Sequence, residues 1–531
     1  MKLLKYVKTR DLQPIVSAIE HNTWFTGLDL SGVKMTGETQ AEVLKVMHKN
    51  CLIEDINLSN TGITVEFVVK LGTAILSNTG SQLTRIDLSK NLLDDRAMIS
   101  FLGSLSNLSR GLSHLNISNT KLTGKGLNKI FELMTQHDSI FGGLQVLNIS
   151  DNSTKGEDLQ NMYRFLGNPN NITHLDLSGI ECALENLMVA LQRGCTSLTH
   201  LYLSKNVYTH KKKEIAVQPS WKQFFASTCS LEYLDMSYCK IPVDALKELM
   251  LGISSNMHLT NLHLNVAGND FQQTGSINIE STIANIHNIA SLDISNNNLD
   301  HGLATLLPWI KTNKSLKHLS IGRNFEHVKQ KQLPTVLDGI VQLIQDEDCD
   351  LESLSLADSK LKHHISLVIN ALGRSNGSLT ELDISGNQMG DFGARMLSKA
   401  LQINNKLKTI IWDKNGVTSQ GFEDVADALE KLKNCESLYL KEFHNEKMPT
   451  PVNDMVVAQQ RSPEKTEAAI QRLLPQLQDV ADRSTGEDNP VGKRLKELSD
   501  DLKKVLDNQM KKTVEDMLEC TTKQFTAINQ R

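Results

Sequence analysis

One short phrase, Leu-x-x-Leu-x-Leu or a close aliphatic variant, returns fifteen times along this chain at intervals of 26 to 35 residues. Its clearest copies begin at Leu83 and Leu379. The mean interval is about 29 residues, which lies within the range of leucine-rich repeats. The repeat decides the fold, because one unit cannot bury its apolar face alone and the units must stack. The first positions of the phrases are Phe25, Ile53, Leu83, Leu112, Leu144, Ile172, Leu198, Leu231, Leu259, Ile289, Leu316, Leu351, Leu379, Leu407 and Cys435.

The phrase itself predicts a short strand followed by a turn. Positions 4 and 6 fall on one face of a strand, because successive side chains alternate between its two faces. An Asn recurs eight residues after the first position, and its side-chain amide can bond the backbone of neighbouring turns that stacking would otherwise bury without partners. This Asn stands at positions 91, 152, 206, 297, 324, 387 and 415.

The rest of each unit predicts a helix. In the segment 389–401, apolar residues recur at helical spacing at Phe392, Met396, Leu397 and Leu401. An Asn three residues before the next phrase predicts where the helix ends, because Asn tolerates the left-handed conformation found at helix ends. Examples of this Asn are Asn256, Asn313, Asn376 and Asn404.

These patterns predict an α/β fold, namely a leucine-rich-repeat solenoid of the ribonuclease-inhibitor-like horseshoe type with a C-terminal helical segment. Parallel strands would lie inside and helices outside, and the wider helices would force the curve. We expect an N-terminal cap over 1–24, a solenoid of about fifteen repeats over 25–445, a C-terminal helical cap over 446–483, a linker over 484–490 and an amphipathic helix over 491–531.

Composition narrows the functional classes. The net charge is −5, so no overall field attracts nucleic acid or an anionic membrane, and aromatic residues make up 5%, which argues against base-stacking platforms. Eight cysteines contain no Cys-x-x-Cys pair, which favours free thiols and a reducing compartment. The chain has neither a signal-peptide run nor an apolar stretch of about 18 residues. We therefore expect a cytoplasmic protein without a nucleic-acid partner.

Positions 3 and 5 of each phrase point away from the core and should line the inner face of the solenoid. In the ninth phrase, begun at Leu259, they are Asn261 and His263. Most of the other residues in these two columns are polar or aromatic, which favours contact with a protein. The candidate contact residues are His174, His200, Tyr202 and Tyr233.

The same face invites a test for a metal site. Neighbouring strands lie about 4.8 Å apart, so His174 and His200 should be neighbours, with Asp176 beside them. Two histidines and a carboxylate are suitable ligand types, but a strand face splays side chains apart, so we predict no metal. The chain also lacks the phosphate-binding loop, the nucleophile elbow and the His-Glu-x-x-His motif. We therefore predict a non-enzymatic protein without catalytic residues or a cofactor.

Two repeats are longer than the others. The first carries Tyr208–Lys213 with a lysine triplet, and the second carries Glu326–Lys331 followed by the acidic run Asp346–Asp348. Insertions in a solenoid form loops on one face. The lysine triplet either is a solvated loop or docks on an acidic partner or a lipid headgroup.

The C-terminal segment changes character. Ser462, Pro463 and Glu464 suit the start of a helix over about 463–482 that would cover the last repeat. A second amphipathic helix must bury its stripe, either against the cap helix or against another chain as a helical dimer. Gln509 and Lys512 interrupt a strict heptad and disfavour a long coiled coil. The proposed dimerisation stripe contains Leu495, Leu498, Leu502, Leu506 and Met510.

Four longer phrases, at 285–300, 343–362, 382–415 and 462–471, resemble the CARMIL family of actin capping-protein regulators. The resemblance covers nearly the whole chain. It implies a large cytosolic scaffold with a membrane-binding pleckstrin-homology-like domain, a leucine-rich horseshoe, a helical dimerisation domain and a disordered tail. In that family the tail inhibits capping protein, which promotes barbed-end growth in lamellipodia and cell migration.

The chain departs from that plan at both ends. Only 24 residues precede the first phrase, and the tail pattern Leu-x-His-x-Thr-x-x-Arg-Pro-Lys is absent. We expect a fragment or a diverged member that supplies the interaction horseshoe and the dimerisation helix but not the capping-protein-binding tail. The resemblance implies actin-regulatory partners, a homodimer, a place at the cytoskeleton and the leading-edge plasma membrane, and membrane binding only through a domain missing from this chain.

Two other classes use similar horseshoes. A leucine-rich-repeat GTPase-activating protein is the alternative, although the final residues 522–531 lack the acidic tail typical of those proteins. An inhibitor that engulfs an enzyme is the third possibility, and eight cysteines over fifteen repeats are too few to favour it.

Overall fold

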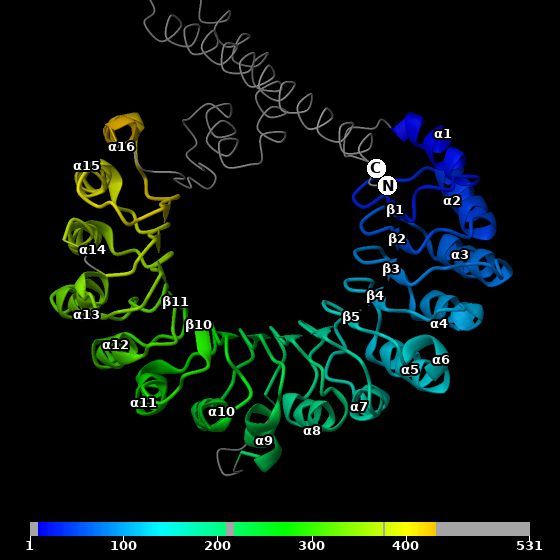
Figure 1. Ribbon diagram of the computed structural model, residues 1–531, viewed down its shortest axis with the longest axis horizontal. Coiled ribbons are helices and arrows are strands. Elements are labelled where there is room, and N and C mark those ends of the chain that lie inside the picture. Colours follow the sequence, from blue (N-terminus) through cyan, green and yellow to red (C-terminus); the bar gives the residue numbers. More distant parts are fainter. Residues whose placement is uncertain (1–8, 209–216, 375–376, 432–531) are drawn as a thin grey trace, which may run out of the picture. The chain divides into compact units, whose positions relative to one another are not determined.

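The computed structural model describes residues 9–208, 217–374 and 377–431, and it divides into a first unit that ends at Glu352 and a second that begins at Ser353 (Figure 1). Several predicted features lie outside the described residues: the fifteenth phrase at Cys435, the segments 446–483, 484–490 and 491–531, and the lysine triplet at 211–213.

In the described part of the first unit, strands and helices alternate, and the strands pair in parallel in chain order. In Figure 1 these strands line the inner side of a curve and the helices lie outside. The strands are β1 (Gly27–Asp29), β2 (Asp55–Asn57), β3 (Arg85–Asp87), β4 (His114–Asn116), β5 (Val146–Asn148), β6 (His174–Asp176), β7 (His200–Tyr202), β8 (Tyr233–Asp235), β9 (Leu262–Asn265), β10 (Ile289–Asp293) and β11 (His318–Ser320). The helices are α1 (Thr9–Ile19), α2 (Gly37–Lys49), α3 (Val65–Ser77), α4 (Asp95–Ser104), η1 (Leu105–Asn107), α5 (Gly124–Gln136), α6 (Asp138–Phe141), α7 (Gln160–Gly167), α8 (Leu184–Gly194), α9 (Pro219–Ser227), α10 (Val243–Ser255), α11 (Gln272–Ile283), α12 (Gly302–Thr312) and α13 (Leu333–Gln345).

The second unit repeats the same pattern. Its strands β12 to β14 also pair in parallel in chain order. Its elements are β12 (Ser353–Ser355), η2 (Lys362–His364), α14 (Ile365–Leu372), β13 (Glu381–Asp383), α15 (Gly390–Leu401), β14 (Thr409–Ile411) and α16 (Ser419–Lys431). The predicted solenoid of inner parallel strands and outer helices is therefore confirmed.

The core follows the strand phrase. Ile86 and Leu88, at positions 4 and 6 of their phrase, are at most 2% exposed, whereas Arg85, at position 3, is exposed on the opposite face of β3. The helices contribute their inner stripe to the same core. In α15, Leu397 and Leu401 are buried as expected, but Phe392 is 58% exposed. The predicted stripe is wrong at Phe392, because Ala394 occupies the buried face instead.

The Asn after each strand joins neighbouring repeats, as predicted. Asn91 is 1% exposed, and its Nδ2 donates to the carbonyl oxygens of Leu58 at 2.8 Å and Leu88 at 2.9 Å. Its Oδ1 accepts from the main-chain N–H groups of Thr61 and Gly62. One buried amide thus satisfies donors and acceptors of two turns, which would be costly to leave without partners.

The ninth repeat corrects the predicted register. His263 pairs with Tyr233 on one side and with Ser291 on the other, so the phrase begins at Asn261 rather than Leu259. His263 therefore stands at position 3 and not at position 5. A shift of two residues keeps the same side chains on the core face, so the apolar pattern alone did not reveal the error.

The corrected register adds Asn269 to the series of buried turn residues. Its Nδ2 donates to the carbonyl oxygens of Met236 at 3.0 Å and Val266 at 2.8 Å. Its own main-chain N–H donates to Oδ1 of Asn297 at 2.7 Å, so the amides of consecutive repeats are linked.

The Asn at the helix ends acts differently from the prediction. Asn256 and Asn313 have φ angles of −82° and −74°, so the predicted left-handed conformation is wrong. The side chain forms the hydrogen bonds at the helix end instead: Nδ2 of Asn256 donates to the carbonyl oxygens of Phe225 and Thr228, each at 2.8 Å. The amide satisfies the carbonyl groups left open at the end of the preceding helix. Asn404 bonds Leu372 in the same way, and Asn376 lies outside the described residues.

The six described cysteines are free thiols, as expected, and four of them are buried. Burial raises the pKa of Cys195 to about 11 and that of Cys239 to about 12. These thiols are therefore uncharged at neutral pH and pack as small apolar groups.

Candidate protein-docking surface

Strand register brings the predicted contact residues together on the strand face of the first unit. Each position-3 residue pairs with the position-3 residue of the next strand, and position 5 behaves in the same way. The first column contains His174, His200, Tyr233 and His263. The second column contains Asp176, Tyr202, Asp235 and Asn265.

Six rings on this face form what we call the ring ladder: His174, His200, Tyr202, Tyr233, His263 and His318. The imidazoles of His174 and His200 are stacked, with centroids 4.2 Å apart and planes 9° apart. The ring of Tyr233 lies 6.1 Å from that of His200 and 5.0 Å from that of Tyr202. His263 continues the ladder 6.4 Å from Tyr233, and its ring lies 6.3 Å from that of His318. The result is a row of stacked and tilted rings on β6 to β9 and β11, with Ser291 at the corresponding position of β10.

The predicted proximity of His174 and His200 is confirmed. Tyr202 and Tyr233 lie in the same ladder, and the role of all four residues in protein contact stays a prediction. His263 was not among the four predicted contact residues, although the sequence already placed it on the inner face, at position 5. His318 was missed because Ser291 separates it from the other rings in the column, although its position 3 in the phrase was a usable signal.

The two stacked histidines are held by the threonines that precede them. Nδ1 of His174 lies 3.0 Å from Oγ1 of Thr173, and Nδ1 of His200 lies 3.0 Å from Oγ1 of Thr199. Each threonine hydroxyl already donates its hydrogen to a carbonyl oxygen, that of Gln145 or that of Thr173. The hydroxyl must therefore accept from Nδ1–H, which leaves Nε2 of each neutral ring as a hydrogen-bond acceptor.

The environment favours uncharged rings. Burial, followed by the neighbouring imidazole of His200, lowers the pKa of His174. Burial, followed by His318 and His200, lowers the pKa of His263. Burial also raises the pKa values of Tyr202 and Tyr233. At neutral pH the imidazoles of His174 and His263 and the phenols of Tyr202 and Tyr233 are therefore uncharged.

Three carboxylates lie at position 5 of alternate strands beside the ladder; we call Asp176, Asp235 and Asp293 the carboxylate column. One oxygen of each accepts a hydrogen bond from the main-chain N–H two residues later, at 2.9 to 3.0 Å. Asn residues provide the same bond at position 5 of other strands, at Asn57, Asn116, Asn148 and Asn265. The turn therefore needs an oxygen acceptor but not a negative charge.

The negative charges of this column reinforce one another. Burial raises the pKa of Asp235, and the carboxylates of Asp293 and Asp176 act in the same direction against the hydrogen bonds from Ser237. Within the part of the chain that the structure describes, no lysine, arginine or histidine nitrogen lies within 4.0 Å of these three carboxylates. The column is thus an uncompensated acidic stripe.

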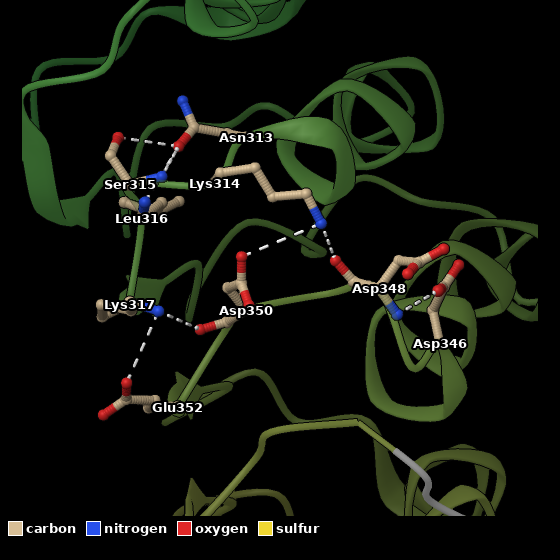
Figure 2. Close-up of polar contacts among 9 residues, drawn as sticks. All are labelled: Asn313, Lys314, Ser315, Leu316, Lys317, Asp346, Asp348, Asp350 and Glu352. Atoms are coloured by element: carbon tan, nitrogen blue, oxygen red, sulfur yellow. Dashed lines mark hydrogen bonds and ion pairs between the residues drawn. The ribbon is translucent and has the colours of Figure 1, made fainter.

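The acidic run of the second long repeat is a useful contrast (Figure 2). Nζ of Lys314 lies 3.8 Å from the carboxylate of Asp350 and also donates to the carbonyl oxygen of Asp348. Nζ of Lys317 lies 3.6 Å from the carboxylate of Glu352. The lysines before β11 therefore face the acidic residues of the following loop.

Lys311, at the end of α12, extends this pairing. Its Nζ lies 2.6 Å from the carboxylate of Asp346, and that hydrogen bond lowers the pKa of Asp346. Asp346 also accepts from the main-chain N–H of Asp348 at 2.9 Å (Figure 2). Asp346, Asp350 and Glu352 thus each have a lysine partner within the repeat. These pairs join two turns of the solenoid, and in this respect the run differs from the carboxylate column.

Metal binding has little geometric support on the ladder. The stacked faces of His174 and His200 leave their nitrogens at the ring edges, and each Nδ1 is already bonded to a threonine hydroxyl. Across the described residues, no group of three or more His, Cys, Asp or Glu side chains is arranged to hold a metal ion. In the same residues, no helix has the length and apolarity needed to cross a membrane.

With the ring ladder and the carboxylate column described, the sequence of the chain can be compared with those of known proteins. A sequence model of the leucine-rich-repeat domain of the CARMIL family matches residues 1–479. The chain belongs to the CARMIL family. The resemblance seen in the four longer phrases is thereby confirmed.

Individual CARMIL relatives agree with this assignment. The chain is 38% identical to human capping protein, Arp2/3 and myosin-I linker protein 3 over 471 residues, which cover 88% of this chain and 33% of that protein. It is 32% identical to protein CARMIL of Dictyostelium discoideum over 448 residues, 83% of this chain and 41% of that protein. The chain therefore spans between about a third and two fifths of the length of these CARMIL relatives.

A further relative carries a different name. The chain is 28% identical to the Rho GTPase-activating protein gacW of Dictyostelium discoideum over 411 residues, which cover 76% of this chain and 33% of that protein. This chain is thus similar to part of a protein named for GTPase activation.

Proposed function

We propose that this chain is the interaction module of a non-enzymatic scaffold that regulates actin-filament assembly. Membership of the CARMIL family supports the actin-regulatory role, and the human relative is named for links to capping protein, the Arp2/3 complex and myosin-I. The observation that carries the docking role is the ring ladder, because stacked neutral rings provide a large, rigid contact area at low entropic cost.

The proposal assigns separate tasks to separate segments. The ring ladder of the first unit would dock a protein, with His174, His200, Tyr202 and Tyr233 in contact. The sequence stripe of Leu495, Leu498, Leu502, Leu506 and Met510 would form a homodimer. Because the Arg-Pro-Lys tail pattern is absent from these 531 residues, regulation of capping protein, and with it lamellipodia and cell migration, would need residues beyond this chain.

Binding of purified actin-regulatory proteins tests the docking role. Capping protein, Arp2/3 complex and a myosin-I tail would each be titrated against the 531-residue chain and against Tyr202→Ala/Tyr233→Ala. The matched control is Phe392→Ala, which removes a partly exposed ring from α15. We expect Arp2/3 complex or the myosin-I tail to bind the wild-type chain and the control equally and the ladder variant at least about tenfold more weakly. Absence of binding to every member of the panel would contradict the proposal.

GTPase activation is the second candidate, and the similarity to gacW is the observation that favours it. A GTP-hydrolysis assay with purified Rho-family GTPases separates the two. The scaffold proposal predicts no acceleration of hydrolysis by the 531-residue chain, whereas acceleration that saturates with chain concentration would favour the alternative.

A further inference from the structure

The surface beside the ring ladder is rich in hydrogen-bond acceptors and carries uncompensated negative charge. The threonine contacts fix Nε2 of His174 and His200 as acceptors. Asp176 and Asp235 add carboxylates whose charge the strand turns do not require. A partner that complements this surface must supply donors and positive charge, which are the properties of arginine and lysine.

The carboxylates are also regularly spaced. Asp176, Asp235 and Asp293 stand at the same position of β6, β8 and β10, so successive carboxylates are separated by two strand spacings, about 9.6 Å. A polyproline-II chain rises about 3.1 Å per residue with three residues per turn. Every third side chain of such a segment therefore returns to the same face after about 9.3 Å, which matches the spacing of the column.

Other binding modes fit less well. Each of the strands β6 to β10 is paired on both sides, so an added strand has no free edge to join there. In a β-strand every third side chain also points to the opposite face. Aromatic side chains at the binding surface are, in contrast, a general feature of polyproline-II recognition.

We propose that the ring ladder and the carboxylate column bind an extended partner segment with an arginine or lysine at every third residue. The segment crosses the strands from β6 to β10 in a polyproline-II conformation. Its cations meet Asp176, Asp235 and Asp293, while its prolines and aliphatic stems lie on the rings of Tyr202 and Tyr233. This inference rests on the proposed docking role of the strand face and specifies the chemistry of the docked segment.

Designed peptides test the spacing directly. The probe is a fluorescein-labelled peptide with five Arg-Pro-Pro repeats, and its comparison has the same composition with all five arginines adjacent. Binding to the 531-residue chain would be followed by fluorescence anisotropy at pH 7.5 and about 50 mM salt, where charge attraction is weakly screened. We expect the spaced peptide to bind at least about fivefold more tightly than the clustered one. Equal binding, or tighter binding of the clustered peptide, would overturn the inference.

A conservative triple variant tests the surface. Asp176→Asn/Asp235→Asn/Asp293→Asn removes three charges but keeps the oxygen that accepts from the main-chain N–H, as Asn does on β2, β4, β5 and β9. At Asp176 the substitution also removes the second oxygen, which accepts from Nδ2 of Asn148 at 3.0 Å. The matched control is Asp383→Asn, at the same position of β13, where Oδ1 accepts from Ser385 at 3.0 Å. We expect the triple variant to bind the spaced peptide at least about tenfold more weakly and the control to stay within about twofold of wild type. Unchanged binding by the triple variant would overturn the inference.

The two proposals fail in different ways. If the spaced peptide fails to bind while Tyr202→Ala/Tyr233→Ala still disrupts binding of a purified protein partner, the docking role stands and the basic-segment chemistry is wrong. If that ladder variant leaves partner binding unchanged, the docking role itself fails.

Discussion

The imidazole rings of His174 and His200 stack face to face, with centroids 4.2 Å apart and planes 9° apart. Two positive imidazolium rings would repel each other at this separation, so at most one ring of the stack carries a charge. The threonine hydroxyls that hold Nδ1 of each ring fix the same tautomer. In the neutral stack, Nε2 of each ring is left as a hydrogen-bond acceptor at the ring edge.

Acid should destabilise this arrangement. The pKa values of His174 and His263 are lowered in the folded chain below the value of about 6.5 expected when unfolded. The unfolded chain therefore binds more protons as the pH falls through about 6.5, and the stability present above that pH is progressively lost below it. Chemical denaturation at pH 7.5 and pH 5.5 should show a lower denaturation midpoint at pH 5.5.

Other titrating groups are controlled by comparison with His174→Gln/His263→Gln. Protonation of Asp235 stabilises the folded chain as the pH falls, because its pKa is raised in the folded state. Protonation of His114 destabilises the folded chain, as for the two substituted histidines, because its pKa is lowered. Both contributions are common to the wild type and the variant. The variant should lose less stability between pH 7.5 and 5.5 than wild type, and an equal loss would show that the ladder histidines do not govern the acid sensitivity.

Replacing a buried turn amide should be costly. Asn297 is 0% exposed, its Nδ2 donates to the carbonyl oxygens of Val266 and Ile294, and its Oδ1 accepts from the N–H of Asn269. Asn297→Ala leaves these groups buried without that partner, which should lower the free energy of unfolding by about 2–4 kcal/mol. The measurement is the urea midpoint followed by far-UV circular dichroism.

The control for that substitution is Asn171→Ala, an exposed Asn whose Nδ2 bonds the carbonyl oxygen of Gly142. Water can replace this bond, so its urea midpoint should stay close to that of wild type. Similar shifts for the buried and the exposed substitution would contradict the structural role assigned to the turn amides.

Much of the fold follows from the sequence because two of its signals are physically strict. The 26- to 35-residue interval fixes a stacked repeat, and the side chain of the buried turn Asn bonds both a main-chain donor and two main-chain acceptors. Register was less secure, because a two-residue slip at Leu259 preserves the core face and misplaced His263. The position of the helix-end Asn was predicted correctly, but the predicted left-handed backbone was not. Asn256 has a φ of −82°, and its side-chain amide bonds the end of the preceding helix.

The candidate site was predictable only in part. Strand spacing alone makes His174 and His200 neighbours, but stacking depends on ring rotation, which the threonine contacts determine. The contrast between the paired acids Asp346, Asp350 and Glu352 and the uncompensated carboxylate column depends on where lysine side chains reach. Periodicity carries no information about those contacts.

Self-association is predicted from the C-terminal stripe, which lies outside the described residues. Fully burying side chains such as Leu498 and Leu502 contributes about 1.5–3 kcal/mol each, partly offset by the entropy of bringing two chains together. We expect a dimer of moderate strength, and Leu498→Glu/Leu502→Glu should sediment as a folded monomer. Lys496→Glu/Lys503→Glu, the matched control, should remain a dimer. A wild-type chain that sediments as a monomer at micromolar concentration would exclude this dimer.

Hydrogen–deuterium exchange on a complex tests the central claim most directly. The 531-residue chain would be compared free and saturated with whichever purified protein of the binding panel associates with it. The account predicts slower exchange in peptides that cover β6 to β10, around His200 and Tyr233, with no change in the outer helices α8 to α11. Protection confined to those helices, with unchanged exchange in the strands, would contradict the assignment of the ring ladder as the docking surface.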